Sequence, residues 1–358
     1  MRGVSRIRRA LRPILKLINI MRRLEHYMLI KSLKAAAIRR FEGEHAASIT
    51  SYADINEMRF KSASGVLPGN TEDIVLSFVL LQYNQYDVTR MAVASILRLE
   101  TPCNVHIVIV DNGSTAPGRD ILEAEYASLP AIHFVHTGEN LGFARGNNFG
   151  YSYAKRTLKS HFIIVANNDV TWPDTATIVK VLSFYNLSHY SIMGPNIEVN
   201  KDGKAVYQNP MRRTLQTKRD AVSALRKYEK LLLDVEGASL NPPQVLGSRK
   251  MARTAIEGEV VLHGSVYILS PAFVFHKNTL FDERTYFYGE EGLLAVSAFG
   301  EGYKMVYEPG IHVLHHTKAS TNLDNLVDFY TKKCKWHTQS ITAYINRIDE
   351  ILNTGARG

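Results

Sequence analysis

Residues 161–174 read HFIIVANNDVTWPD, and this stretch points to the fold class of the chain. Phe162 to Ala166 form an unbroken run of five apolar residues, which is typical of a strand buried on both faces in a parallel sheet. The run ends abruptly in Asn167, Asn168 and Asp169. In open α/β sheets ligands bind at this carboxyl edge of the strands, but asparagine and aspartate are also common in ordinary turns. The neighbouring strands decide between these two interpretations.

Strand-like and helix-like segments alternate around this stretch. The sequence predicts strands at 75–81, 105–110 and 132–135, and helices at 88–99, from about 117, from the glycine-rich stretch 139–151 to about 158, and at 174–185. Such alternation predicts an α/β fold with a mostly parallel central sheet flanked by helices. Three strand ends then carry polar side chains to one edge: Tyr83 with Asn84, Asp111 with Asn112, and Asn167 to Asp169. One polar strand end indicates a turn, but three on one edge indicate a ligand site.

The rest of the chain divides by composition. We expect a basic helical segment at 1–41, a polar connector at 42–73, a main domain at 74–320 with halves 74–200 and 201–320, and a C-terminal helical segment at 321–358. The second half is less regular, and residues 205–257 are its least patterned part. The elements expected there are a charged helix at 212–236, strands at 259–270 and within 304–320, and a final helix at about 325–352.

The composition is ordinary for a soluble globular protein, with 45% hydrophobic and 22% charged residues. No stretch approaches the roughly 18 uncharged apolar residues of a membrane span. Lysine and arginine interrupt the apolar run near the start, which argues against a signal peptide. The two cysteines, Cys103 and Cys334, cannot form a disulfide framework or a metal cluster by themselves. These features predict a cytoplasmic setting.

The basic charge of the chain is concentrated in its first forty residues. They hold twelve lysines and arginines against one acid, Glu25, while the other 318 residues hold 31 basic and 33 acidic residues. An apolar stripe at spacings of three and four runs through the same segment: Ile14, Leu17, Ile18, Met21, Leu24 and Met28. A basic amphipathic helix predicts binding of residues 1–40 to an anionic membrane surface. A helix packed on the body or on a partner protein is the alternative, and the apolar stripe argues against a nucleic-acid arm.

The ordered motifs between residues 75 and 320 resemble those of a family 2 glycosyltransferase with the GT-A fold. In the first half these are Tyr83-Asn84, VIVDNGS (108–114), ENLGFARGNNFGY (139–151) and NND (167–169). In the second half they are HGSVYILS (263–270), FDERTYFYGEE (281–291) and PGIHVLHHTKAS (309–320). Each motif alone is weak, but their order is specific. The resemblance is greatest to the rhamnosyltransferase-like branch, which builds bacterial surface polysaccharides such as the O-antigen of lipopolysaccharide.

The resemblance implies a role for each matching residue. Asp169, at the last position of the D-x-D motif, and His315 would bind a divalent metal, Mn²⁺ or Mg²⁺, on the donor diphosphate. Glu290 and Glu291 would form the catalytic pair, with Glu291 as base and Glu290 orienting the acceptor. The nucleotide would be bound by residues of the three strand ends and the glycine-rich loop: Tyr83, Asn84, Asp111, Asn140, Gly142, Arg145, Gly146, Asn147 and Asn168.

The chemistry of glycosyl transfer requires groups of these types. The leaving nucleoside diphosphate is highly anionic, which suits a hard cation held by carboxylate and water. The acceptor hydroxyl needs a general base, and direct displacement inverts the anomeric carbon. Two departures from the family pattern concern this site: Asn167 replaces the first aspartate of D-x-D, and Glu291 replaces the usual aspartate of the pair. Without the surrounding motifs, both glutamates could be helix N-terminal carboxylates and His315 an ordinary strand-end residue.

The sequence therefore predicts an inverting, metal-dependent glycosyltransferase. It would move a sugar from a UDP- or dTDP-linked donor to a glycan or lipid-linked glycan acceptor, as a peripheral protein at the inner face of the cytoplasmic membrane. A nucleotidyltransferase would need a glycine-rich, lysine-bearing loop after the first strand, and QYNQYDVTR (82–90) has none. A non-catalytic subunit that binds nucleotide sugars or serves as a scaffold is the remaining alternative.

Overall fold

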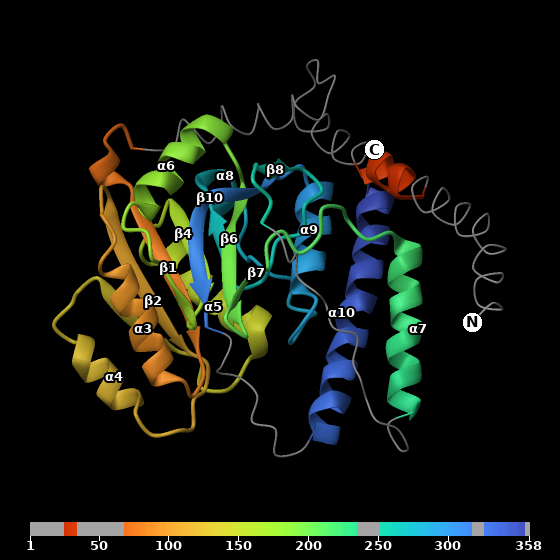
Figure 1. Cartoon of the computed structure of the whole chain (residues 1–358), viewed down its shortest axis with the longest axis horizontal. Helices are drawn as coiled ribbons and strands as arrows, with labels where there is room; N and C mark the ends of the chain where they lie inside the picture. Colours follow the sequence, from red (N-terminus) through yellow and green to blue (C-terminus); the bar gives the residue numbers. More distant parts are fainter. Residues whose placement is uncertain (1–24, 34–67, 235–250, 317–325, 355–358) are drawn as a thin grey trace.

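One mixed sheet runs through the centre of the computed structural model, which describes residues 25–33, 68–234, 251–316 and 326–354 (Figure 1). The strand order is β3-β2-β1-β4-β9-β6-β10-β5, with β7 paired to β6 and β8 paired to β10. The strands are β1 (Val75–Gln82), β2 (Asn104–Asp111), β3 (Ile132–His136), β4 (Phe162–Asn167), β5 (Val170–Thr171), β6 (Ile192–Lys201), β7 (Lys204–Tyr207), β8 (Ile256–Glu257), β9 (Val266–Leu269) and β10 (Met305–His315).

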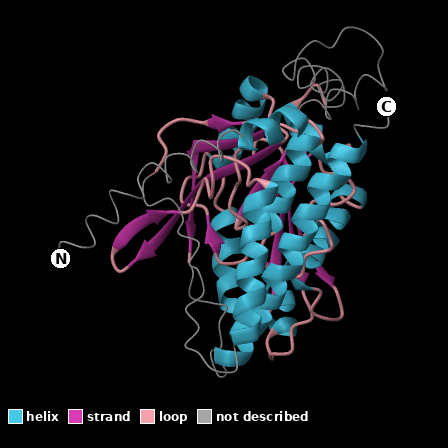
Figure 2. Ribbon diagram, turned by 90° about the vertical axis from the view of Figure 1, so that its right-hand side faces the viewer, coloured by secondary structure: helices cyan, strands magenta, loops and turns pink. Residues whose placement is uncertain are grey.

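Helices cover both faces of this sheet. On one face α3 and α6 contribute to a hydrophobic cluster with β1, β2 and β4, and on the other face α5, α9 and α10 contribute to a second cluster. Helices α7 and α10 lie side by side at the right of Figure 1, and Figure 2 shows the helical layer in front of the sheet. The helical elements are η1 (Thr71–Asp73), α3 (Tyr86–Ile96), α4 (Arg119–Tyr126), α5 (Gly142–Arg156), α6 (Thr177–Ser188), α7 (Lys218–Asp234), α8 (Pro271–Val274), α9 (Glu290–Gly300) and α10 (Leu326–Thr354).

The first half of the sheet is parallel and brings three polar strand ends to one edge. β1 pairs in parallel with β2 and β4, and β2 pairs in parallel with β3. In this register Gln82 lies opposite Asp111, and Leu81 lies opposite Asn167. The apolar runs that form these strands are almost wholly buried, as expected where helices cover both faces. The predicted α/β fold, with a mostly parallel sheet flanked by helices, is confirmed.

The second half differs from the sequence expectation in two places. The strand expected at 259–270 is only four residues long, because its first part runs irregularly before β9 begins at Val266 and pairs antiparallel with β4 and β6. The hairpin β6–β7 was not predicted, because Pro195 interrupts the strand pattern. β10 accommodates this proline with a register shift between Glu308 and His312, directly after the residue paired with Pro195.

Residues 25–33 form a helix that packs on the body. Leu29, Ile30 and Leu33 are buried in the cluster that contains α9 and α10, whereas Met28 is 58% exposed. One face of this helix therefore packs on the body, and Met28, the last residue of the apolar stripe, lies on its exposed face. The rest of that stripe (14–24) and most of the expected connector (42–67) lie outside the described residues. In the described part of the chain no helix is long and apolar enough to cross a membrane.

Candidate active site

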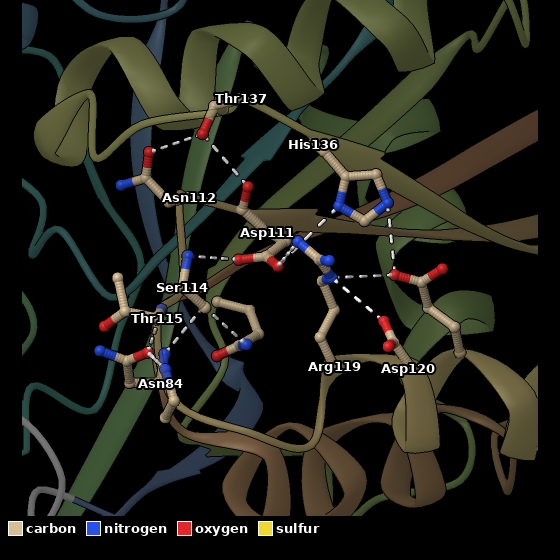
Figure 3. Close-up of polar contacts among 12 residues, drawn as sticks. Asn84, Asp111, Asn112, Ser114, Thr115, Arg119, Asp120, His136 and Thr137 are labelled. Atoms are coloured by element: carbon tan, nitrogen blue, oxygen red, sulfur yellow. Dashed lines mark hydrogen bonds and ion pairs between the residues drawn. The ribbon is translucent and has the colours of Figure 1, made fainter.

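Asp111 presents a buried carboxylate oxygen at the end of β2. Its Oδ1 accepts a hydrogen bond from the backbone N–H of Ser114 at 2.9 Å, while Oδ2 is buried and accepts no hydrogen bond from the described residues. Arg119 Nη1 and His136 Nδ1 lie 4.0 and 3.9 Å from Oδ2, and Figure 3 shows both side chains flanking it. A buried acceptor beside two half-exposed donors is suited to a ligand that supplies the missing hydrogen bond. Neither Arg119 nor His136 was singled out from the sequence.

Asn84 and Asn112 hold the loops around Asp111 in place. The side-chain oxygen of Asn84 accepts hydrogen bonds from the backbone N–H groups of Thr115 and Ala116, both at 2.8 Å. Asn112 is buried, and its amide bonds to Leu141 N at 3.0 Å and Gly142 O at 3.2 Å. Both asparagines therefore fix backbone geometry at the strand ends. Asn112 belongs to the VIVDNGS motif but was not predicted as a site residue.

Glycine is required at Gly142 in the glycine-rich loop and at Gly113 after β2, because other segments approach both positions closely. Gly142 has a φ of +78°, and a Cβ there would lie 2.5 Å from the backbone oxygen of Tyr286. Gly113 has a φ of +71°, and a Cβ there would lie 2.4 Å from Glu139. The backbone N–H of Phe143 also donates to Tyr286 O at 2.8 Å. The loop is thus fixed between the end of β2 and the segment that precedes the glutamate pair.

The other predicted nucleotide-binding residues divide between scaffold and surface. Asn168 donates to Thr89 Oγ1 at 2.9 Å, and Asn147 is buried and donates to Phe143 O at 2.9 Å within its helix. The remaining four lie at or near the same edge: Tyr83 is 43% exposed, Arg145 and Asn140 are exposed, and Gly146 packs on Leu81. Direct contact of these residues with a nucleotide stays a prediction.

The two-residue strand β5 brings Asp169 to His315. Directly after the NND turn, Val170 pairs antiparallel with His315, and the backbone N–H of His316 donates to Asp169 O at 2.8 Å. As a result, Asp169 Oδ1 and His315 Nε2 lie 3.2 Å apart, and both side chains are largely buried. The structure therefore joins two residues that are 146 positions apart in the sequence and that were predicted to share a metal.

The chemistry of this pair fits a divalent cation. Asp169 Oδ1 is buried and accepts no hydrogen bond from the described residues. Two cis ligands of an octahedral ion with bonds of about 2.1 Å lie about 3 Å apart, close to the observed separation. No group of three or more histidine, cysteine or acidic side chains suitable for a metal occurs within the described ranges. A cation here would therefore take its other ligands from water and from a bound diphosphate.

Glu290 and Glu291 are the first two residues of α9, where burial removes their carboxyl groups from water. Glu290 is 4% exposed, and its Oε1 has no hydrogen-bond partner among the described residues. Burial, and then the negative charge of Glu291, raises the pKa of Glu290. Burial also raises the pKa of Glu291, although the backbone N–H groups of Glu291 itself, Gly289 and Gly264 and the charge of Arg212 oppose that rise. Three backbone N–H groups and Arg212 support the charge of Glu291, whereas a single backbone N–H supports that of Glu290. Glu291 is therefore the member suited to be ionised while Glu290 stays protonated.

The raised pKa of Glu290 predicts a pH-dependent stability. The folded state keeps this proton to a higher pH than the unfolded chain, so stability is complete below the ordinary glutamate pKa and falls as the pH rises through the folded pKa. We expect Glu290→Gln to be about 1–3 kcal/mol more stable than wild type near pH 8 but about equal near pH 4, as measured by urea unfolding. The exposed Glu229→Gln on α7 serves as control. A Glu290→Gln effect that is the same at both pH values would contradict the assignment.

Residues 263–265 connect the carboxylate pair to Asp169 and His315. Gly264 lies against Glu291, since a Cβ there would be 2.9 Å from Glu291 Oε1. Ser265 Oγ lies 3.2 Å from His315 Nδ1, and Ser265 O accepts a hydrogen bond from the backbone N–H of Asn167. The two predicted groups, one for a cation and one for a base, thus meet around a single segment. Both His263 and Ser265 belong to the HGS motif, but neither was predicted as a site residue.

Comparisons with known proteins support the family that the sequence motifs indicated. A family model described as "Glycosyl transferase family 2" matches residues 77–246, which confirms the family that the motifs indicated. The low-salt glycan biosynthesis hexosyltransferase Agl10 of Haloferax volcanii is 30% identical over 103 residues, which are 29% of this chain and 31% of that relative. The chain therefore matches about a third of the length of this curated relative.

Solved structures with similarity to the chain include one complex with a nucleotide and one with a nucleotide sugar. S. aureus TarS bound to UDP aligns with a TM-score of 0.46 at 14% identity, covering 68% of this chain and 61% of that one. The mannosyltransferase PcManGT of Pyrobaculum calidifontis, with GDP-Man and Mn²⁺, aligns with a TM-score of 0.43 at 13% identity, covering 91% of this chain and 85% of that one.

Proposed function

The chain carries a family 2 glycosyltransferase domain, and on this premise we propose that it transfers a sugar from a nucleotide-sugar donor to a glycan or lipid-linked glycan acceptor. The observation that carries this proposal is the meeting of two groups around residues 263–265. One group is the buried Asp169–His315 pair, and the other is the desolvated Glu290–Glu291 pair. A hexosyltransferase among the similar proteins supports the same reaction class.

The donor end of the site is proposed to lie along the carboxyl edge of the parallel strands. Asp111 Oδ2, which lacks a hydrogen bond, would accept one from the base or ribose, and Asp169 with His315 would hold Mn²⁺ or Mg²⁺ on the diphosphate. When bound, such a cation would neutralise charge that develops on the leaving group. UDP- and dTDP-linked sugars are the proposed donors.

The acceptor end is proposed to lie at Glu290 and Glu291. Ionised Glu291 would remove the proton of the acceptor hydroxyl as that oxygen attacks the anomeric carbon. Protonated Glu290 would donate a hydrogen bond that orients the acceptor. Attack from the side opposite the leaving diphosphate inverts the anomeric configuration, so we propose an inverting reaction, in the synthesis of a surface polysaccharide. The basic residues 1–24 are proposed to hold the enzyme at an anionic membrane surface.

Calorimetric titration of UDP and dTDP, each with and without Mn²⁺, tests the proposal. We expect metal-dependent binding of one nucleotide, weakened at least about 10-fold in Asp169→Ala because half of the protein's cation ligands are removed. The exposed Glu229→Ala is the control. Equal binding with and without Mn²⁺ would remove the cation from the proposal. No binding of either nucleotide would favour the scaffold alternative.

A further inference from the structure

A short chain of hydrogen bonds stands behind His315, on the side away from Asp169. His315 Nδ1 lies 2.7 Å from Gln208 Oε1 and 3.2 Å from Ser265 Oγ. Ser265 Oγ in turn lies 3.0 Å from His263 Nδ1. Gln208 directly follows β7, and its own backbone N–H donates to Ile197 O at 2.9 Å, so the main chain at this point is anchored to β6. Side chains from two separate segments therefore converge on one ring nitrogen.

The available donors fix the direction of each hydrogen bond. The backbone N–H of Ser265 donates to His263 Nδ1 at 3.2 Å, so that nitrogen is an acceptor. The Ser265 hydroxyl hydrogen is then directed to His263 Nδ1 as well, and its oxygen is left to accept from His315. The side-chain carbonyl of Gln208 can only accept. Both neighbours of His315 Nδ1 are therefore acceptors, and this nitrogen carries the hydrogen.

This arrangement leaves Nε2 as the ring nitrogen of His315 that is available to a cation. In this tautomer Nε2 and Asp169 Oδ1 are two acceptors that lie 3.2 Å apart with no hydrogen bond between them. Oδ1 is buried and accepts no hydrogen bond from the residues that the structure describes. Two facing acceptors repel each other unless a positive charge lies between them. The geometry is that of a metal-binding histidine whose other ring nitrogen donates to a protein carbonyl.

We propose that Gln208 is a positioning residue for the cation site. By accepting the hydrogen of His315 Nδ1, it fixes both the tautomer and the ring orientation that point Nε2 toward the cation. This inference rests on the proposed function, since it deepens the role given there to Asp169 and His315. It also gives the segment 205–257, the least patterned part of the sequence, a role in the cation site.

Two substitutions at Gln208 separate hydrogen bonding from packing. Gln208→Met keeps the length of the side chain but lacks the acceptor, and we expect it to weaken Mn²⁺ affinity about 10-fold or more. Gln208→Glu keeps an acceptor oxygen, and we expect it to bind Mn²⁺ within about 2-fold of wild type or more tightly. Gln339→Met, at an exposed position of α10, is the matched control. Mn²⁺ binding is followed by the electron paramagnetic resonance signal of free Mn²⁺, with UDP and with dTDP.

Electron spin-echo spectra of bound Mn²⁺ supply a readout independent of activity. Nitrogen modulation from His315 is expected in wild type and Gln208→Glu, and is expected to be weak or absent in Gln208→Met. If wild type binds Mn²⁺ but Gln208→Met binds equally well with full nitrogen modulation, the inference is wrong while the proposed function stands. If wild type binds a nucleotide but no Mn²⁺, both the inference and the proposed cation site fail. Urea unfolding midpoints confirm that each variant is folded.

Discussion

Glu291→Gln is expected to reduce the rate of sugar transfer by about 10²–10⁴-fold, the usual contribution of a general base. The amide keeps the size of the side chain but cannot take the acceptor proton. Three backbone N–H groups and the charge of Arg212 also support the ionised form of Glu291. The rate is followed as nucleotide release from the nucleotide sugar whose base the titration identifies. Nucleotide binding is expected to stay unchanged, because no donor-binding residue is altered.

The pH profile of the same reaction distinguishes the base from its neighbour. Burial raises the pKa of Glu291 above its ordinary value, so kcat/KM of wild type should fall as the pH is lowered through that raised pKa and the base becomes protonated. Glu290→Gln should keep this acid limb at nearly the same pH, because Glu290 is protonated and neutral while Glu291 titrates. If Glu291→Gln keeps full activity while Glu290→Gln loses it, the two roles are reversed.

Removal of residues 1–24 is expected to abolish sedimentation with anionic vesicles. This segment holds eight lysines and arginines and no acid. At roughly 1 kcal/mol per basic residue near an anionic surface, its loss should lower partitioning by more than about 100-fold at moderate salt. Transfer to a soluble acceptor should remain, because the cut lies outside the site. Sedimentation of wild type and truncated protein with phosphatidylserine-containing and purely phosphatidylcholine vesicles measures the effect.

The position of the cut matters, because the following helix belongs to the body. Leu33 is completely buried, and His26 contacts Glu259 at 2.5 Å. A second truncation that removes residues 1–40 should therefore also lower the unfolding midpoint, whereas removal of 1–24 should not. Vesicle binding that persists after removal of residues 1–24 would show that the basic segment is not the membrane anchor.

The sequence predicted the parallel half of the fold well because its signals there are local. The apolar runs of β1, β2 and β4 each end in polar residues, and the alternation with helices leaves few possible topologies. β6 and β7 escaped prediction because Pro195 argues against a strand interior, and only a register shift in β10 accommodates it. The charged helix at 212–236 was expected, and the structure places α7 inside that range.

In the candidate site, too, the sequence predicted residues with local signals and missed a residue whose role depends on tertiary contacts. The motifs identified Asp111, Asp169, His315 and the glutamate pair, because each lies at a strand or helix end with a recognisable pattern. Gln208 had no such pattern, since its contact with His315 depends on how a hairpin folds back beside β10. The supporting roles of Asn84 and Asn168 also depend on loop geometry that spacing does not specify.

The short strand β5 has a consequence for protein engineering. Asp169 comes from the first half of the main domain and His315 from the second, and only two residue pairs between β5 and β10 set their separation. A chimaera that joins residues 74–200 of this chain to the second half of another family member would leave the donor-side motifs intact. It would nevertheless lose the proposed cation site unless the exchanged strand restored the Val170–His315 pairing and the backbone bond from residue 316 to Asp169. The proposed cation site therefore depends on both halves of the main domain, and recombination between homologues should cross over outside both β5 and the end of β10.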